Sequence, residues 1–98
     1  TDLRLRLADR LSRFGDFDAA LDECRAAVAL NPSDALAHLQ LGVLLMARQD
    51  WTSAGSSLQQ AVRLDHDLTQ AHYNLGSVHY ALGNAKAAMQ SYREALAL

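Results

Sequence analysis

Apolar residues recur at three- or four-residue intervals in six separate stretches of this chain. In the first stretch Leu3, Leu7 and Leu11 share one side of a helix, with arginine and aspartate between them. The second stretch keeps this spacing with small or apolar residues at Ala20, Leu21, Cys24, Ala27 and Val28. Each stretch predicts an amphipathic α-helix, and together they predict an all-α chain.

Short polar segments separate the predicted helices. After the first helix, Gly15 can relieve the backbone at a helix end, and Asp16 or Asp18 can accept hydrogen bonds from the free amides that follow. The segment from Asn31 to Asp34 ends the second helix, because its proline disfavours helix in the residue before it and its serine or aspartate can cap the next helix. Equally short breaks follow at residues 49–51, 65–67 and 83–84. Connections this short make successive helices antiparallel neighbours.

The predicted helix pairs are copies of one unit that recurs every 34 residues. Residues 1–34, 35–68 and 69–98 form the units, and their shared positions hold small or apolar residues. In the second and third units these positions include Leu41 and Leu75, Gly42 and Gly76, Ala54 and Ala88, and Ala61 and Ala95. A fixed period of this length is typical of a solenoid of stacked helix pairs, so residues 1–98 are predicted to form one repeat domain.

The two helices of the second unit differ in character. Residues 35–47 are apolar nearly all round, so this helix is expected to have two neighbours, or one neighbour and one groove. The helix that follows, at about residues 52–63, contains the poor helix formers Gly55, Ser56 and Ser57. We expect it to be the weakest of the six.

The repeated positions resemble the tetratricopeptide repeat, whose 34-residue pattern is W-x2-L-G-x2-Y followed by A-x3-F, A and P. The resemblance covers all 98 residues and is clearest in the third unit, which places on the pattern His72, Leu75, Gly76, His79, Ala88, Tyr92 and Ala95. Arg4 and Ala8 depart from the pattern in the first unit. The resemblance implies a right-handed superhelix of about six antiparallel helices, here a fragment of a larger protein.

In this family the first helices of the repeats line a concave groove that holds the ligand. By family position the groove residues, apolar in the middle and polar at the rim, are Leu5, Leu36, Leu39, Gln40, Val43, Met46, Gln70, Tyr73, Asn74, Ser77 and Tyr80. The same face continues in the first unit through Asp2, Arg6, Asp9, Ser12 and Arg13. The resemblance therefore implies a protein-interaction scaffold that binds a peptide or a partner helix.

The groove positions also bear on the kind of partner. Family members that grip acidic chaperone tails use lysine, arginine and asparagine at positions that here hold Leu5, Asp9, Gln40, Gln70 and Asn74. Members that hold a peptide backbone use a ladder of asparagines, which Arg6, Gln40 and Asn74 match in part. The resemblance favours a protein or peptide partner that is neutral and partly apolar.

Other readings of the same residues stay open. Met89, Tyr92 and Leu96 on the last helix have no following helix to cover them, so copies of the chain could stack end to end or dimerise. The groove could also be covered by another part of the same protein. A further alternative is the non-catalytic, substrate-selecting repeat region of a larger enzyme, which these residues do not test.

Composition argues against several function classes. The chain has 9 Lys and Arg against 11 Asp and Glu, so we expect no attraction to nucleic acid or to anionic membranes. Its longest apolar run, residues 41–47, is far shorter than the ~20 residues of a membrane span. With no secretory signal, a cytoplasmic location is favoured, and the bias toward arginine, alanine and leucine suggests a GC-rich bacterial source.

No catalytic, cofactor or phosphate-binding motif occurs, so the chain is predicted not to be an enzyme and to use no cofactor. His38, His72 and His79 take positions that are aromatic in the family and are interpreted as packing residues with a polar edge. His66 lies between two aspartates in a loop and is expected to be solvated, without a metal. Cys24 is the single cysteine, cannot form an internal disulfide, and is predicted to be a small buried hydrophobe.

Overall fold

The computed structural model of the chain describes residues 2–13 and 15–98, apart from the side chains of residues 2 and 11–13. Among these residues the secondary structure is helical, with no strand. The helices are α1 (Asp2–Arg13), α2 (Phe17–Leu30), α3 (Ala35–Ala47), α4 (Trp51–Leu64), α5 (Thr69–Ala81) and α6 (Ala85–Ala97). The prediction of an all-α chain of about six helices is confirmed.

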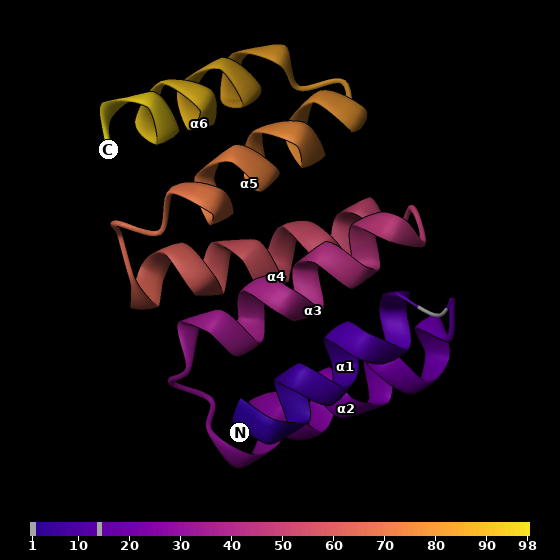
Figure 1. The fold of residues 1–98 in the computed structure, drawn as a ribbon. Helices are drawn as coiled ribbons and strands as arrows, with labels where there is room; N and C mark the ends of the chain where they lie inside the picture. The colour runs from indigo at the N-terminus through magenta and orange to yellow at the C-terminus, as the bar shows by residue number, and fades with distance from the viewer. Residues whose placement is uncertain (1, 14) are drawn as a thin grey trace.

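The helices stack as pairs in chain order (Figure 1). α1 packs on α2, α3 on α4 and α5 on α6, while α2 with α3 and α4 with α5 join one pair to the next. The first helices of the pairs also touch, α1 with α3 and α3 with α5. The stack measures 35 × 24 × 18 Å, and its two ends are formed by the first and the last pair (Figure 1).

Aspartates begin several of the helices. Asp16 accepts a hydrogen bond from the amide of Ala19, and Asp34 accepts one from the amide of Leu36. Asp50 does the same for α4. These contacts satisfy amides that have no partner within the helix, and they confirm the expected caps at the first two breaks.

The helices of the second and third pairs meet where a glycine faces a large side chain. A Cβ atom added to Gly42 would lie 2.7 Å from Cγ of Leu58, and one added to Gly76 would lie 2.7 Å from the ring of Tyr92. Real Cβ atoms do not approach other atoms this closely, so each glycine allows its two helices to pack together.

The first pair uses a different combination at the equivalent positions. Ala8 stands where the other pairs have glycine, and Cys24 stands where they have leucine or tyrosine. Both residues are buried, with exposed fractions of 1% and 0%. The smaller residue on the second helix compensates for the methyl group on the first, which explains why Ala8 can depart from the family pattern.

Gly55, inside α4, lies at the junction between the second and third pairs. A Cβ atom there would be 3.3 Å from Cγ1 of Val78 on α5, a tight contact. This glycine therefore costs helix stability but brings α5 close to α4. α4 is continuous from Trp51 to Leu64, and its being the weakest helix stays a prediction.

Candidate functional site

The surface formed by α1, α3 and α5, called here the A face, corresponds to the predicted groove. Between α1 and α3 it contains a hollow of about 310 Å³, lined by Leu5, Arg6, Asp9, Leu36 and Gln40. The A face therefore has a concave site at the junction of the first two pairs, and residues from two helices reach it.

The predicted groove residues divide by exposure. Leu36, Tyr73 and Tyr80 are exposed, with fractions of 52%, 57% and 72%. Gln70 is exposed as well, and the half-buried residues are Gln40, Val43, Met46, Asn74 and Ser77. Apolar rings and an aliphatic side chain thus stand above a layer of partly buried amides and small side chains. The predicted rim side chains of residues 2, 12 and 13 lie outside the described part of the chain.

Two of the predicted groove residues belong to the core. Leu39 has an exposed fraction of 5%, so its prediction as a groove-lining contact is wrong. Leu5 is also buried, with 9% exposed, although it borders the hollow between α1 and α3. The next pair covers both leucines, since α3 packs against α1 and α5 packs against α3.

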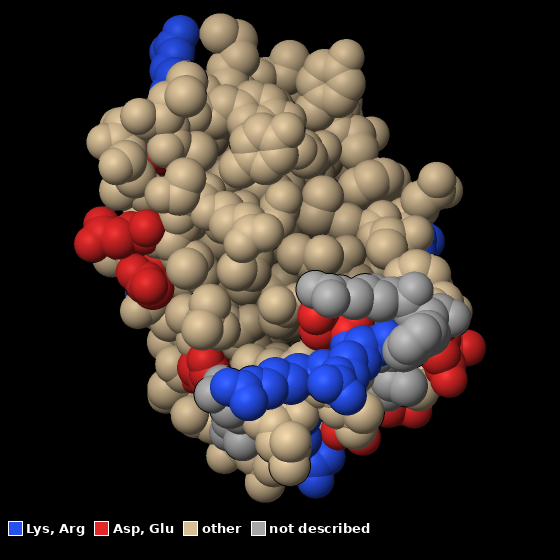
Figure 2. All heavy atoms as spheres, viewed as in Figure 1, with Lys and Arg blue, Asp and Glu red and all other residues tan. Residues whose placement is uncertain are grey.

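Charge is distributed unevenly over the stack. Neither α3 nor α5 contains an aspartate, glutamate, lysine or arginine. Figure 2 shows charged side chains gathered around the first pair, with the face over the later pairs mostly free of them. The second and third pairs therefore present an A face without formal charge.

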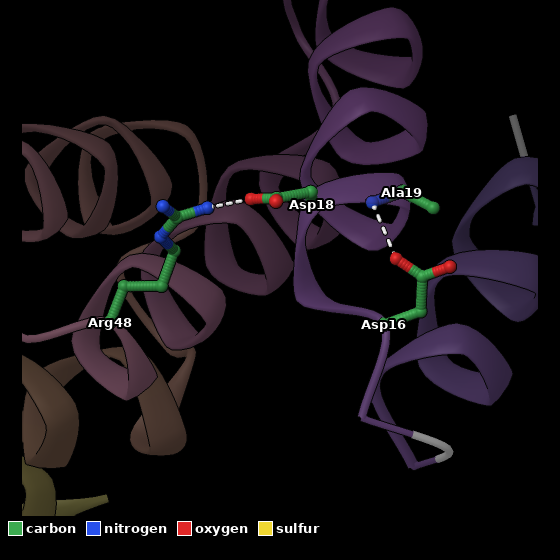
Figure 3. Close-up of polar contacts among 4 residues, drawn as sticks. All are labelled: Asp16, Asp18, Ala19 and Arg48. Atoms are coloured by element: carbon green, nitrogen blue, oxygen red, sulfur yellow. Dashed lines mark hydrogen bonds and ion pairs between the residues drawn. The ribbon is translucent and has the colours of Figure 1, made fainter.

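An ion pair links the first pair to the second. Arg48, directly after α3, pairs with Asp18 near the start of α2, beside the cap formed by Asp16 and Ala19 (Figure 3). Both partners are exposed, so the pair contributes little to stability but fixes which charges meet at this junction.

Tyr92, predicted to be part of an uncovered end, packs inward instead. Its ring lies 5.5 Å from the ring of Tyr73, and its hydroxyl is 3.1 Å from Oγ of Ser77. Its prediction as a residue without a covering helix is therefore wrong, because α5 of its own pair covers it. Met89 and Leu96 are exposed as predicted, with fractions of 54% and 87%.

The α5–α6 end carries the largest hollow found on the described residues, with a volume of about 710 Å³. It is lined by Thr69, Gln70, Tyr73, Tyr92, Ala95 and Leu96. Sequence reasoning missed Thr69 and Ala95 as surface residues. The signal that could have identified them is the 34-residue period, since Ala35 and Ala61 are the residues that face the next pair from the equivalent positions.

The histidines pack as predicted, with polar edges. Nε2 of His38 lies 2.9 Å from the carbonyl oxygen of Pro32, and Nε2 of His72 lies 2.9 Å from that of His66. His72 is 7% exposed, and its Nδ1 lies 3.1 Å from Oε2 of Glu94 on α6. Each of these two histidines ties the first helix of its pair to the preceding turn. His79 is half-buried, and the side chain of His66 is exposed.

Cys24 is fully buried, with 0% exposed. Burial raises the pKa of its thiol to about 11, and the negative charge of Glu23 acts in the same direction. A thiol with this pKa is protonated at neutral pH and is a poor nucleophile. No group of three metal-ligating side chains occurs within residues 2–13 and 15–98, side chains 2 and 11–13 aside.

Comparison with known proteins decides the family. Residues 5–69 and residues 69–98 each match a profile described as tetratricopeptide repeat. The chain belongs to the tetratricopeptide repeat family. Its all-α stack of helix pairs is the superhelix of that family, as the resemblance implied.

The relatives of this tetratricopeptide repeat chain include a ubiquitin ligase. The E3 ubiquitin-protein ligase CHIP of Arabidopsis thaliana is 31% identical over 83 residues, which are 78% of this chain and 30% of that protein. The chain therefore spans less than a third of this relative.

Solved structures share the fold at lower identity. The second TPR of Spaghetti (RPAP3), bound to the HSP90 peptide SRMEEVD, has a TM-score of 0.94 at 20% identity and covers 97% of this chain and 88% of that one. MamA has a TM-score of 0.92 at 24% identity, covering 98% of this chain and 56% of that one. Within the described part of the chain, the helices lack the length and hydropathy that crossing a membrane requires.

Proposed function

We propose that the chain is a protein-interaction module that binds an uncharged, partly apolar peptide segment on its A face. The observation that carries this proposal is the combination of exposed Leu36, Tyr73 and Tyr80 with α3 and α5 helices that contain no charged residue. Exposed aromatic and aliphatic side chains gain free energy when a partner covers them. A face without formal charge offers nothing to offset the desolvation of a partner's charges.

Two amides supply the polar contacts of the proposed site. Gln40 and Asn74 occupy the same position in successive repeats, and both are half-buried on the A face. An amide side chain carries both donors and an acceptor, so it can pair with the N–H and the C=O of an extended peptide. Spaced one repeat apart, the two amides can hold a peptide backbone while the apolar side chains select its residues.

This specificity differs from that of the structural neighbours with a bound peptide. The peptide in the Spaghetti domains, SRMEEVD, contains three acidic residues. The corresponding positions in this chain, taken from the family pattern, hold Leu5, Asp9, Gln40, Gln70 and Asn74, none of them cationic. We therefore expect this chain to bind an acidic tail of that kind much more weakly than a neutral peptide.

Selection from an unbiased peptide display library, followed by affinity measurements, tests the proposal. Asn74→Ala should weaken binding of the selected peptide about tenfold, since a lost hydrogen bond of the polar interface costs roughly 1 to 1.5 kcal/mol. Tyr80→Ala should weaken it by a similar factor. Gln59→Ala, an exposed position on α4 away from the A face, is the matched control and should leave affinity unchanged.

Two results would contradict the proposed function. One is a selected peptide whose affinity is insensitive to both Asn74→Ala and Tyr80→Ala in proteins that are shown to be folded by circular dichroism. The other is selection of strongly acidic peptides, which would mean that the uncharged A face does not determine specificity.

A further inference from the structure

The hollow at the α5–α6 end is distinct from the hollow between α1 and α3. It faces away from the rest of the stack, at the end of the molecule opposite the first pair (Figure 1). Tyr73 borders both this end and the A face, whereas Tyr92, Ala95 and Leu96 belong to the end alone. A ligand here would therefore contact α6, which is not part of the A face.

The internal repeats show what normally fills this position. Leu5 and Leu39, the equivalents of Tyr73, are 9% and 5% exposed, whereas Tyr73 is 57% exposed. Val28 and Val62 are half-buried at the position where Leu96 is 87% exposed. In the first two pairs the cover is the next helix, α3 on α2 and α5 on α4. The third pair thus has a seat for a helix that stands open.

The covering helices share a pattern on their buried side. Each has a fully buried alanine near its start, Ala37 in α3 and Ala71 in α5. Leucine follows four residues later in both helices, and a buried aliphatic residue, Leu44 or Val78, follows seven residues later. Positions spaced by four and seven lie on one side of a helix. A helix that fits the open seat should carry the same three residues.

Charge adds a fourth position to this pattern. Arg48, eleven residues after Ala37, pairs with Asp18 of α2. At the open end the position equivalent to Asp18 is Lys86, whose sign is opposite. An incoming helix should therefore carry an acidic residue eleven positions after its alanine. The middle junction has uncharged residues at both of these positions, Leu82 and Thr52.

A second copy of this chain fits the seat poorly. Stacked end to end, it would present α1, which has Leu3 in place of the alanine and Arg10 in place of Leu44 or Val78. Leu3 would overpack a site built for a methyl group, and Arg10 would be buried near Met89 rather than beside an acid. The first pair therefore lacks the chemistry that the open end calls for.

We propose that the α5–α6 end is a docking seat for an amphipathic helix of a partner protein, separate from the A face. The helix carries alanine, leucine four residues later, a branched aliphatic residue seven residues later and an acidic residue eleven residues later. Its apolar side covers Tyr92, Ala95 and Leu96, and its acidic residue pairs with Lys86.

The probe is a synthetic peptide with the sequence of residues 67–84 in which Leu82 is replaced by glutamate. It keeps Ala71, Leu75 and Val78, and so contains the whole proposed pattern. Titrated into the isotope-labelled 98-residue chain, it should shift the NMR signals of Met89, Ala95 and Leu96 while leaving Leu36 and Gln40 unchanged. The same peptide with Leu82→Lys should bind about threefold more weakly, the size expected for an exposed charge pair.

Two variants of the chain complete the test. Leu96→Asp should weaken binding at least tenfold, whereas Leu30→Asp, at an exposed leucine that ends α2, is the matched control and should have no effect. Lys86→Glu should reverse the preference between the two peptides. Both leucines are exposed by more than 60%, so neither substitution should unfold the chain.

Three outcomes would overturn the proposal. They are signal changes confined to the A face, equal binding of the two peptides to the unaltered chain, and dimerisation of the chain that Leu96→Asp abolishes in sedimentation velocity. The last outcome would make a second copy the occupant. Because the readouts lie on α6, failure here leaves the A-face proposal to its own test.

Discussion

At the scale of single residues, the fold depends on matched sizes across each helix pair. Glycine faces leucine or tyrosine in two pairs, and alanine with cysteine occupies the same positions in the first. The family pattern predicts that a small residue is needed on the first helix. It does not predict the size of the residue opposite, which only the interhelix distance decides.

The first prediction concerns Gly76. Replacement by alanine should lower the free energy of unfolding by about 1 to 3 kcal/mol, because the new methyl group would lie 2.7 Å from the Tyr92 ring. Gly55→Ala is the matched control, since both glycines are inside helices but a Cβ at Gly55 would meet only Val78, at 3.3 Å. Urea denaturation measures both. A Gly76→Ala protein as stable as the Gly55→Ala protein would contradict the proposed packing.

The second prediction concerns Cys24. Its thiol should react with a disulfide reagent at pH 8 far more slowly in the folded chain than in urea, because it is buried and its pKa is raised to about 11. The folded state holds the proton more tightly than the unfolded state does, whose pKa is 9.0. The resulting stabilisation is present below pH 9 and is lost as the pH rises toward 11. Rapid labelling of the folded chain at pH 8 would contradict this account.

At the scale of helices, position in the stack determines how many neighbours each helix has. α3 packs against α1, α2, α4 and α5, whereas α6 packs against α5 alone. In a solenoid, stability comes from a unit and its immediate neighbours, so the helices at the ends are less protected than those in the middle.

Hydrogen exchange tests this order. The backbone amides of α3 should exchange most slowly and those of α6 much faster, in a measurement by mass spectrometry or NMR at neutral pH. The same data test the expected weakness of α4, which should exchange faster than α2, its equivalent in the first pair. Protection of α6 equal to that of α3 would contradict the neighbour argument.

Helix positions were largely predictable from the sequence, and side-chain exposure was not. Gly15, Asp16 and Asp34 mark helix ends by their own chemistry, so those breaks could be placed without a structure. Leu39 and Tyr73 hold the same repeat position, yet one is buried and the other exposed. The difference depends on whether another pair follows, which a position within the repeat does not contain.

At the scale of the whole molecule, charge and binding surface are separated. The charged side chains gather at the first pair, while α3 and α5 give the A face of the other pairs an uncharged surface (Figure 2). The net charge of −2 describes neither part well. A family assignment alone would suggest an acidic peptide as readily as a neutral one, and the residues on the A face favour the neutral one.

The most direct test of the proposed A-face function is an NMR titration of the labelled chain with the tightest peptide from the unbiased selection. The account predicts that the largest signal changes fall on Leu36, Gln40, Asn74 and Tyr80, and that exposed positions of α2 and α4 stay unchanged. Changes concentrated on α2 and α4, with those four residues unaffected, would contradict it.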